Sequence, residues 1–223
     1  MTPYKLTRET TLDDYERGII YTRAALAADP NTADLLPMTD GWGARVELAR
    51  AIRRASWEAD IGADAQRRIS NDGLDVSCSE FGAELGLQNK PGTEIYRLFF
   101  RNMTASRFIK QALSTQVGAV ETWLITTENP VLERHRARIT PWVRAARAAL
   151  TATDASAVPM GKWQITRATL AEDMTRERDA LWAALDERRR ERNLPRDWPG
   201  LFFTVQATRA AKVVEEEQRE EAE

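Results

Sequence analysis

The sequence predicts an all-α protein, either a helical bundle or an elongated array of helices. Apolar residues recur at three- and four-residue steps along most of the chain, which is the pattern of helices with one buried face. The 223 residues are 43% hydrophobic and 30% charged, a balance typical of helix-rich globular proteins. The short apolar run at 96–100 could form a strand. It has no partner strand, so we expect a helical turn that closes one end of the bundle.

An internal similarity divides the chain into two related halves. An Ala-Ala-Leu triplet, a Pro-Met pair, a Trp and a Phe-Phe pair follow one another twice in the same order. We therefore predict a duplicated helical hairpin, with one repeat at 1–103, a second at 104–206 and an acidic tail at 207–223. The first repeat is the longer one, and the extra residues are assigned to an insertion at 71–92. The repeated positions are Leu26, Pro37, Trp42 and Phe100, and Leu150, Pro159, Trp163 and Phe203.

The first half contains clear helix boundaries. Thr11, followed three residues later by Asp14, forms a variant of the capping box and starts the first helix. That helix should end near Asp29, because Pro30 disfavours a helical conformation in the residue before it. A second helix is expected from about 42 to 70. It should be followed by a turn at Asn71-Asp72-Gly73 and a further helix that ends at Leu85.

The buried side of the second helix is predicted to be rich in small residues. Such a side allows a neighbouring helix to approach closely, and this explains a glycine at position 62 better than a break in the helix does. A glycine inside a helix costs about 1 kcal/mol relative to alanine. The residues assigned to this buried side are Leu48, Ile52, Ala55, Ala59, Gly62 and Ile69.

The second half begins with Thr104, which can cap a helix running to about Leu124. Asn129 then caps the next helix, whose first residue is Pro130. After a connection around Pro159, which is equivalent to the one around Pro37, a last helix is expected at 163–192. Its final turns, at 186–192, are almost wholly charged and should project into water or bind a partner.

Composition limits the classes of function. The net charge is −2, so no strong overall field attracts the chain to nucleic acid or to a membrane. The only cysteine, Cys78, excludes an internal disulfide and is typical of a reducing compartment. No stretch approaches the roughly 18 apolar residues needed to span a bilayer. The N-terminus lacks the apolar core of a signal peptide, so we expect a cytoplasmic protein.

Two side chains could carry chemistry, His135 and Cys78. His135 lies on an apolar helical stripe with Leu132 and Ile139, and no set of metal ligands surrounds it in the sequence. A packed, hydrogen-bonded histidine and a buried thiol are therefore the favoured interpretations. The sequence predicts no catalytic residue, cofactor site or metal site. The alternative is an enzyme or a small-molecule-binding bundle with a pocket near His135.

Arginine clusters and tryptophans are the remaining candidates. The arginines at 53–54, 67–68 and 188–190 alternate with acidic residues, which indicates solvated, ion-paired helix faces more often than nucleic-acid binding. Most of the seven tryptophans are expected in the core. Trp57 and Trp182 flank their apolar stripes and are the expected exposed ones. The predicted interaction surface consists of Trp57, Trp182, Arg188, Arg189 and Arg190.

The function predicted from these observations is non-catalytic. We expect a helical structural or protein-interaction module that binds a protein partner or a second copy of itself. The alternatives are the enzyme or small-molecule binder described above and a nucleic-acid-associated protein that uses the arginine clusters.

Overall fold

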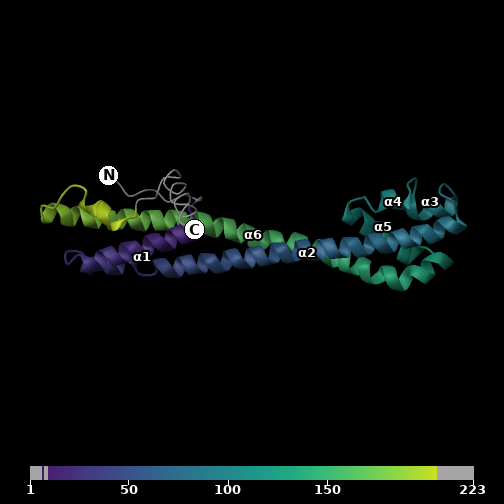
Figure 1. Cartoon of the computed structure of the whole chain (residues 1–223), viewed down its shortest axis with the longest axis horizontal. Helices are drawn as coiled ribbons and strands as arrows, with labels where there is room; N and C mark the ends of the chain where they lie inside the picture. Colours follow the sequence, from purple (N-terminus) through teal and green to yellow (C-terminus); the bar gives the residue numbers. More distant parts are fainter. Residues whose placement is uncertain (1–6, 8–9, 205–223) are drawn as a thin grey trace, which may run out of the picture. The chain divides into compact units, whose positions relative to one another are not determined.

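The computed structural model describes residue 7 and residues 10–204, and this part of the chain is all helical, without strands (Figure 1). The all-α prediction is confirmed. The predicted tail at 207–223 lies outside the described residues. Among the helices described, none is long and apolar enough to cross a membrane. The α-helices are α1 (Leu12–Ala28), α2 (Trp42–Gln88), α3 (Glu94–Phe100), α4 (Ala105–Phe108), α5 (Leu113–Thr126) and α6 (Pro130–Glu191), with two 3-10 helices, η1 (Ala33–Thr39) and η2 (Trp198–Phe202).

The chain forms two compact units. Unit 1 consists of Met1–Arg53 and Lys162–Glu223, and unit 2 consists of Arg54–Gly161. The long helices α2 and α6 each contribute one segment to either unit. The repeats proposed at 1–103 and 104–206 follow a different division, and they stay a prediction about the sequence.

The hairpin predicted around Pro159 is wrong. Pro37 lies in the 3-10 helix η1 between α1 and α2, whereas Pro159 lies inside the unbroken helix α6. Proline inside a helix costs about 3 kcal/mol, so packing on either side must offset this cost. Next to Pro159, the sulfur of Met160 accepts a hydrogen bond from the Ser56 hydroxyl of α2 at 3.7 Å. The duplicated hairpin is therefore not confirmed.

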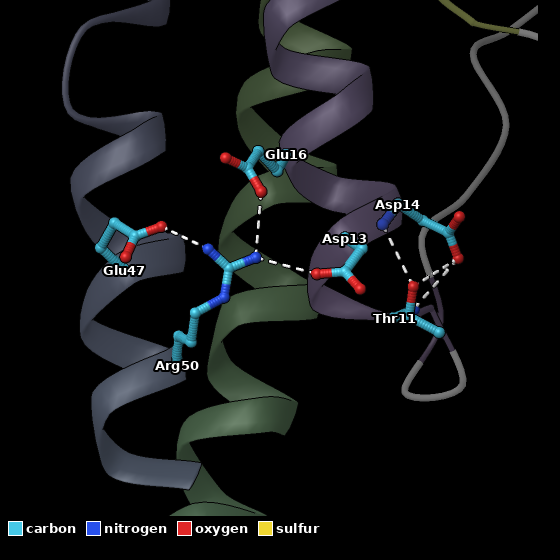
Figure 2. Close-up of polar contacts among 6 residues, drawn as sticks. All are labelled: Thr11, Asp13, Asp14, Glu16, Glu47 and Arg50. Carbon is cyan, nitrogen blue, oxygen red and sulfur yellow. Dashed lines mark hydrogen bonds and ion pairs between the residues drawn. The ribbon is translucent and has the colours of Figure 1, made fainter. Parts of the chain in front are cut away.

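Unit 1 is a small bundle of α1, the first part of α2 and the last part of α6, closed by η2. The predicted capping box forms at the start of α1, where the Thr11 hydroxyl accepts from the backbone N–H of Asp14 at 3.1 Å. Figure 2 shows how Arg50 of α2 holds α1, donating to Asp13 at 2.9 Å and to Glu16 at 3.0 Å. The same guanidinium donates to Glu47 of its own helix at 2.6 Å.

The charged end of α6 belongs to unit 1 and binds the connection between α1 and α2. Arg188 donates two hydrogen bonds to the carboxylate of Asp34, at 2.8 and 2.7 Å, and another to the backbone oxygen of Asn31. Arg192 reaches the side chain of Asn31 at 2.6 Å. The expectation that 186–192 projects into water or binds a partner is therefore wrong for Arg188 and Arg192, because the connection between α1 and α2 supplies their acceptors.

Unit 2 has an aromatic core. Phe81 of α2 lies against Phe99 and Phe100 of α3, and Trp123 of α5 contacts all three rings at centroid distances of 5.4–5.7 Å. The expectation that 96–100 is a buried helical turn is confirmed. Both Phe-Phe pairs of the repeated order are buried: Phe99, Phe100, Phe202 and Phe203.

The helix expected from Thr104 to Leu124 is interrupted. Thr104 caps α4 as predicted, but the chain bends between Phe108 and Leu113 before α5 begins. The buried side chain of Gln116 holds this bend, because its amide donates to the backbone oxygens of Ile109 at 3.1 Å and Gln111 at 3.0 Å. An apolar stripe alone does not reveal such a bend, because the stripe continues through it.

The turn predicted at Asn71-Asp72-Gly73 is also wrong, because α2 runs through it. Gly73 is required by packing: a Cβ atom built there would lie 2.3 Å from the ring of Trp142 of α6. Only a residue without a side chain lets this ring lie on the backbone. Gly62, where the sequence suggested close approach, has no neighbour within 4 Å of such an atom.

The buried side of α2 in unit 2 is rotated from the predicted one. Ala55 and Ile69 are exposed, as is Leu48 in the part of α2 that belongs to unit 1, and small residues at a seven-residue step are buried instead. Because small side chains let helix axes come close, these residues form the side of α2 that approaches α6. The buried small residues are Ser56, Ala63, Ser70 and Ser77.

Substitution of Gly73 tests this packing. Gly73→Ala should lower the free energy of unfolding by about 1–3 kcal/mol, because overpacking against Trp142 outweighs the better helix propensity of alanine. The matched control is Gly62→Ala in the same helix, which should stabilise by about 0.5–1 kcal/mol because space is available there. Chemical denaturation of both variants provides the measurement. Equal stabilisation by both substitutions would contradict the close approach of Trp142.

Candidate interaction surface

An exposed apolar row follows α2 through unit 2. Trp57 is 65% exposed, Ile61 50%, Ile69 66% and Val76 44%. We call these four residues the α2 apolar face. Other exposed apolar side chains of unit 2 lie on different helices or at the end of α2, such as Leu87 and Ile125.

The α2 apolar face lies opposite the buried side of the same helix. At about 100° of rotation per residue, the four side chains fall within an arc of about 120°. The buried small residues that start at Ser56 and Ala63 are centred about 180° away on the helix. A surface helix normally carries polar residues on its outer side. Here four large apolar side chains lie on the outer side of α2 among charged ones, and the buried side carries small residues at positions 56, 63, 70 and 77.

Charged residues flank and interrupt this face. Arg54 donates to Glu58 at 2.8 Å, and Arg67 and Arg68 both reach Asp64 at 2.8 Å. The hydrogen bond from Arg67 is the main cause that lowers the pKa of Asp64, and desolvation acts in the opposite direction. Glu58 likewise raises the pKa of Arg54. These exposed pairs within one helix contribute little to stability, so their charges can exchange partners readily.

The structure separates the residues of the predicted interaction surface. Trp57 is exposed as expected and belongs to unit 2, while the other four belong to unit 1. Trp182 is not an exposed exception: its ring packs against Phe203 at 5.7 Å beside the core of unit 1. Arg188 binds Asp34, and Arg189 and Arg190 both bind Asp186. These arginines are ion-paired, as the alternating charges indicated.

Sequence reasoning missed Ile61, Ile69 and Val76 as exposed residues, and it assigned Ile69 to the buried side. A signal was present in the sequence. Small residues recur every seven positions at 56, 63, 70 and 77, and a seven-residue step keeps side chains on the seam between two supercoiled helices. Placing that seam inside would have placed Trp57 and Ile61 on the opposite, outer side.

His135 is bound to a glutamate. Its Nε2 lies 2.7 Å from Oε2 of Glu84 on α2, and its ring meets the edge of Phe81. Arg134 also donates to Glu84, with Nε at 2.8 Å from Oε1. Hydrogen bonds from His135 and then Arg134 lower the pKa of the Glu84 carboxyl. This arrangement ties α6 to α2 and confirms the expectation of a hydrogen-bonded histidine.

Cys78 is buried in the core of unit 2, as expected. Desolvation, and to a smaller extent the nearby charge of Asp75, raises the pKa of the thiol to about 12. The thiolate is the nucleophilic form of cysteine, so this side chain is poorly suited to nucleophilic chemistry. Burial also raises the pKa of Asp75 itself, although Asn71 donates a hydrogen bond to its carboxylate at 2.8 Å.

A hollow of about 350 Å³ lies beside α3, α4 and α5. Phe99, Phe100 and Trp123 contribute apolar surface to it, and Gln111 and Ser114 contribute polar groups. His135 is not among the residues that line it. The pocket that the enzyme alternative would place near His135 is therefore not this one.

Within residue 7 and residues 10–204, no three His, Cys, Asp or Glu side chains are grouped so that they could hold a metal ion. Comparisons of the chain with protein-family models, with curated proteins and with solved structures find no match.

The Glu84 contacts predict a pH effect. Because the pKa of Glu84 is lowered in the folded protein, its stabilising effect is present above the ordinary value of 4.5 and is lost as the pH falls through the folded value. Glu84→Gln should therefore reduce the dependence of the unfolding free energy on pH between about 5 and 3. Urea unfolding at several pH values measures this, with Glu172→Gln as the control on an exposed glutamate of α6. An unchanged slope for Glu84→Gln would contradict the assignment.

Cys78 should resist alkylation in the folded protein. A rise in the thiol pKa from 9.0 to about 12 lowers the thiolate fraction at pH 8 by about a thousandfold. Labelling with iodoacetamide should therefore be at least that much slower in buffer than in concentrated guanidinium chloride, where the thiol is exposed. Mass spectrometry measures both rates. Comparable rates under the two conditions would show that Cys78 is accessible in the native state.

Proposed function

We propose that this chain is a non-catalytic helical module that binds a protein through the α2 apolar face. The observation that carries the proposal is the pair of opposite faces on α2 in unit 2. Ser56 and Ala63 are buried on one side, and Trp57, Ile61 and Ile69 are exposed on the other. A surface helix needs only one apolar side, the one that packs on its own protein. Apolar side chains on the opposite side of α2 are therefore available to bind a second protein.

The size of the face supports binding. From their exposed fractions, the four side chains expose on the order of 400–500 Å² together, as large as the largest apolar patch of a typical monomer. Burial of this area is favourable at about 25 cal/mol per Å² before the costs of association are subtracted. Tryptophan is also the residue type most enriched among energetic hot spots of interfaces. We therefore expect Trp57 to make the largest single contribution.

The surroundings of Cys78 and His135, the two side chains with catalytic potential, favour packing over chemistry. The raised pKa of Cys78 opposes nucleophilic attack by its thiol, and Glu84 occupies Nε2 of His135. Both residues lie in the helix packing of unit 2, so they support a structural rather than a catalytic role. We expect the cytoplasm as the compartment, in agreement with the single reduced cysteine.

Photo-crosslinking tests the proposal. A photoreactive amino acid at position 61 in the full chain should give a covalent protein adduct after irradiation in the native lysate. The same group at position 125, an exposed isoleucine of α5 in the same unit, should not give that adduct. A further substitution, Ile69→Asp, should abolish the adduct. Because Ile69 is largely exposed, this change should alter stability by only about 0.5 kcal/mol.

The result that would overturn the proposal is equally specific. Absence of any adduct at position 61, or an adduct that Ile69→Asp leaves intact, would show that the α2 apolar face is not a protein-binding surface. The adduct is identified by mass spectrometry, so adducts with a second copy of the chain and with another protein are distinguished.

A further inference from the structure

We propose that the protein bound by the α2 apolar face is a second copy of this chain, with the two α2 helices antiparallel. This inference rests on the proposed function and names its partner. It also specifies a register, in which Arg54 of one copy lies level with Asp72 of the other, and Glu58 lies level with Arg68.

The order of charges on the face carries the inference. In unit 2, the exposed charged residues of α2 within the same arc as the apolar side chains are Arg54, Glu58, Arg68 and Asp72, so their signs run plus, minus, plus, minus. In an antiparallel copy aligned at the middle of this row, Arg54 faces Asp72 and Glu58 faces Arg68. Because the pair is symmetric, each of these attractive contacts occurs twice. In a parallel copy in the same register, every charged residue faces the identical residue of the other copy, so all four contacts are repulsive. The charge pattern therefore selects the antiparallel arrangement.

The available ion pairs are compatible with this arrangement. Arg54 and Glu58 pair within one helix, and Arg68 pairs with Asp64; of these four residues only Asp64 is half-buried. Among the described residues, Asp72 forms no ion pair within the chain, and it is exposed. Arg54 of a second copy would supply the missing cation. Shifting the register so that Glu58 comes level with Asp72 would instead bring two carboxylates together, which is unfavourable.

The middle of the row allows close approach. In the proposed register, Ile61 of one copy lies level with Ala65 of the other, and Gly62 is beside them. Ala65 is exposed, and nothing lies within 4 Å of a Cβ atom built at Gly62. Small residues near the symmetry axis let two helices come together, while Trp57 and Ile69 cover the two edges of the contact.

The size of the contact predicts its strength. Two such faces bury on the order of 1,000 Å² in total, which is at the low end for specific protein–protein interfaces. The pair should therefore be reversible and dependent on concentration. Symmetry requires that each surface contact occurs twice, so a single substitution perturbs two contacts.

Charge reversal with sedimentation equilibrium tests both the partner and the register. Glu58→Arg and Arg68→Glu should each weaken self-association by about tenfold or more, because each converts two attractive pairs into repulsive ones. An equimolar mixture of the two variants should regain association, because the mixed pair places Arg opposite Glu at both positions. The double variant should regain it too, although its pairs with Arg54 and Asp64 remain lost. Rescue therefore separates contacts between copies from contacts within the helix.

Asp173→Arg and Arg176→Glu serve as matched controls, because these residues form a similar exposed pair on α6. Neither reversal should change self-association. Circular dichroism on every variant verifies that the helices remain folded.

Cysteine crosslinking fixes the direction of the helices. In the Ala65→Cys variant, a short bismaleimide should crosslink position 65 of one copy to position 65 of another. The Asp72→Cys variant should not crosslink, because an antiparallel pair places the two Asp72 positions at opposite ends. A mixture of Arg54→Cys and Asp72→Cys should crosslink. The native Cys78 is buried, and Cys78→Ala can be used as the background for all three. Efficient crosslinking of Asp72→Cys to itself would overturn the antiparallel register.

The outcomes distinguish this inference from the proposed function. A wild-type chain that stays monomeric at all concentrations overturns the inference. If position 61 still gives a specific photo-adduct with a different protein, the proposed function stands and only the partner is wrong. If the chain is monomeric and position 61 gives no adduct, both fail.

Discussion

The packing of Trp142 on the backbone at Gly73 is the contact on which the arrangement of unit 2 depends. A Cβ atom at this position would lie 2.3 Å from the ring, so the contact exists only because residue 73 has no side chain. It fixes the rotation of α2 about its own axis relative to α6. Ser56 near Met160 and Glu84 near His135 then lie on the same inner side. Once that side is set, Trp57 and Ile69 necessarily point outward.

The two residues that first suggest chemistry illustrate how packing determines their properties. Cys78 lies among apolar side chains, and the desolvation of its thiolate raises its pKa to about 12. Glu84 remains partly exposed, and donors from α6 lower its pKa. The same pair of helices therefore moves the pKa values of a buried thiol and a partly exposed carboxyl in opposite directions. Both effects follow from position across the helix pair, and neither requires a ligand.

Unit 1 is held together by a different kind of contact. Arg50 bridges α1 and α2 (Figure 2). Arg188 holds the connection after α1 through Asp34 and Asn31. Exposed pairs of this sort contribute modestly on their own. They act on elements that the apolar core of unit 1 has already brought together, and they determine where the charged end of α6 lies. In unit 2, by contrast, ring contacts and close backbone packing set the positions of the helices.

By itself the sequence determined that the chain is helical and where several helices begin. Thr11, Thr104 and Asn129 cap their helices as predicted, because a cap is satisfied by backbone groups two or three residues away. It also indicated that His135 and Cys78 are packed, because both lie in apolar patterns.

Only the tertiary structure decided whether Gly73 and Pro159 end a helix, because continuation depends on partners that are distant in the sequence. It also decided which side of α2 is outside. Apolar and small residues occur all around that helix, and although the seven-residue spacing of small residues favours one side, the contact with Trp142 settles which side is buried.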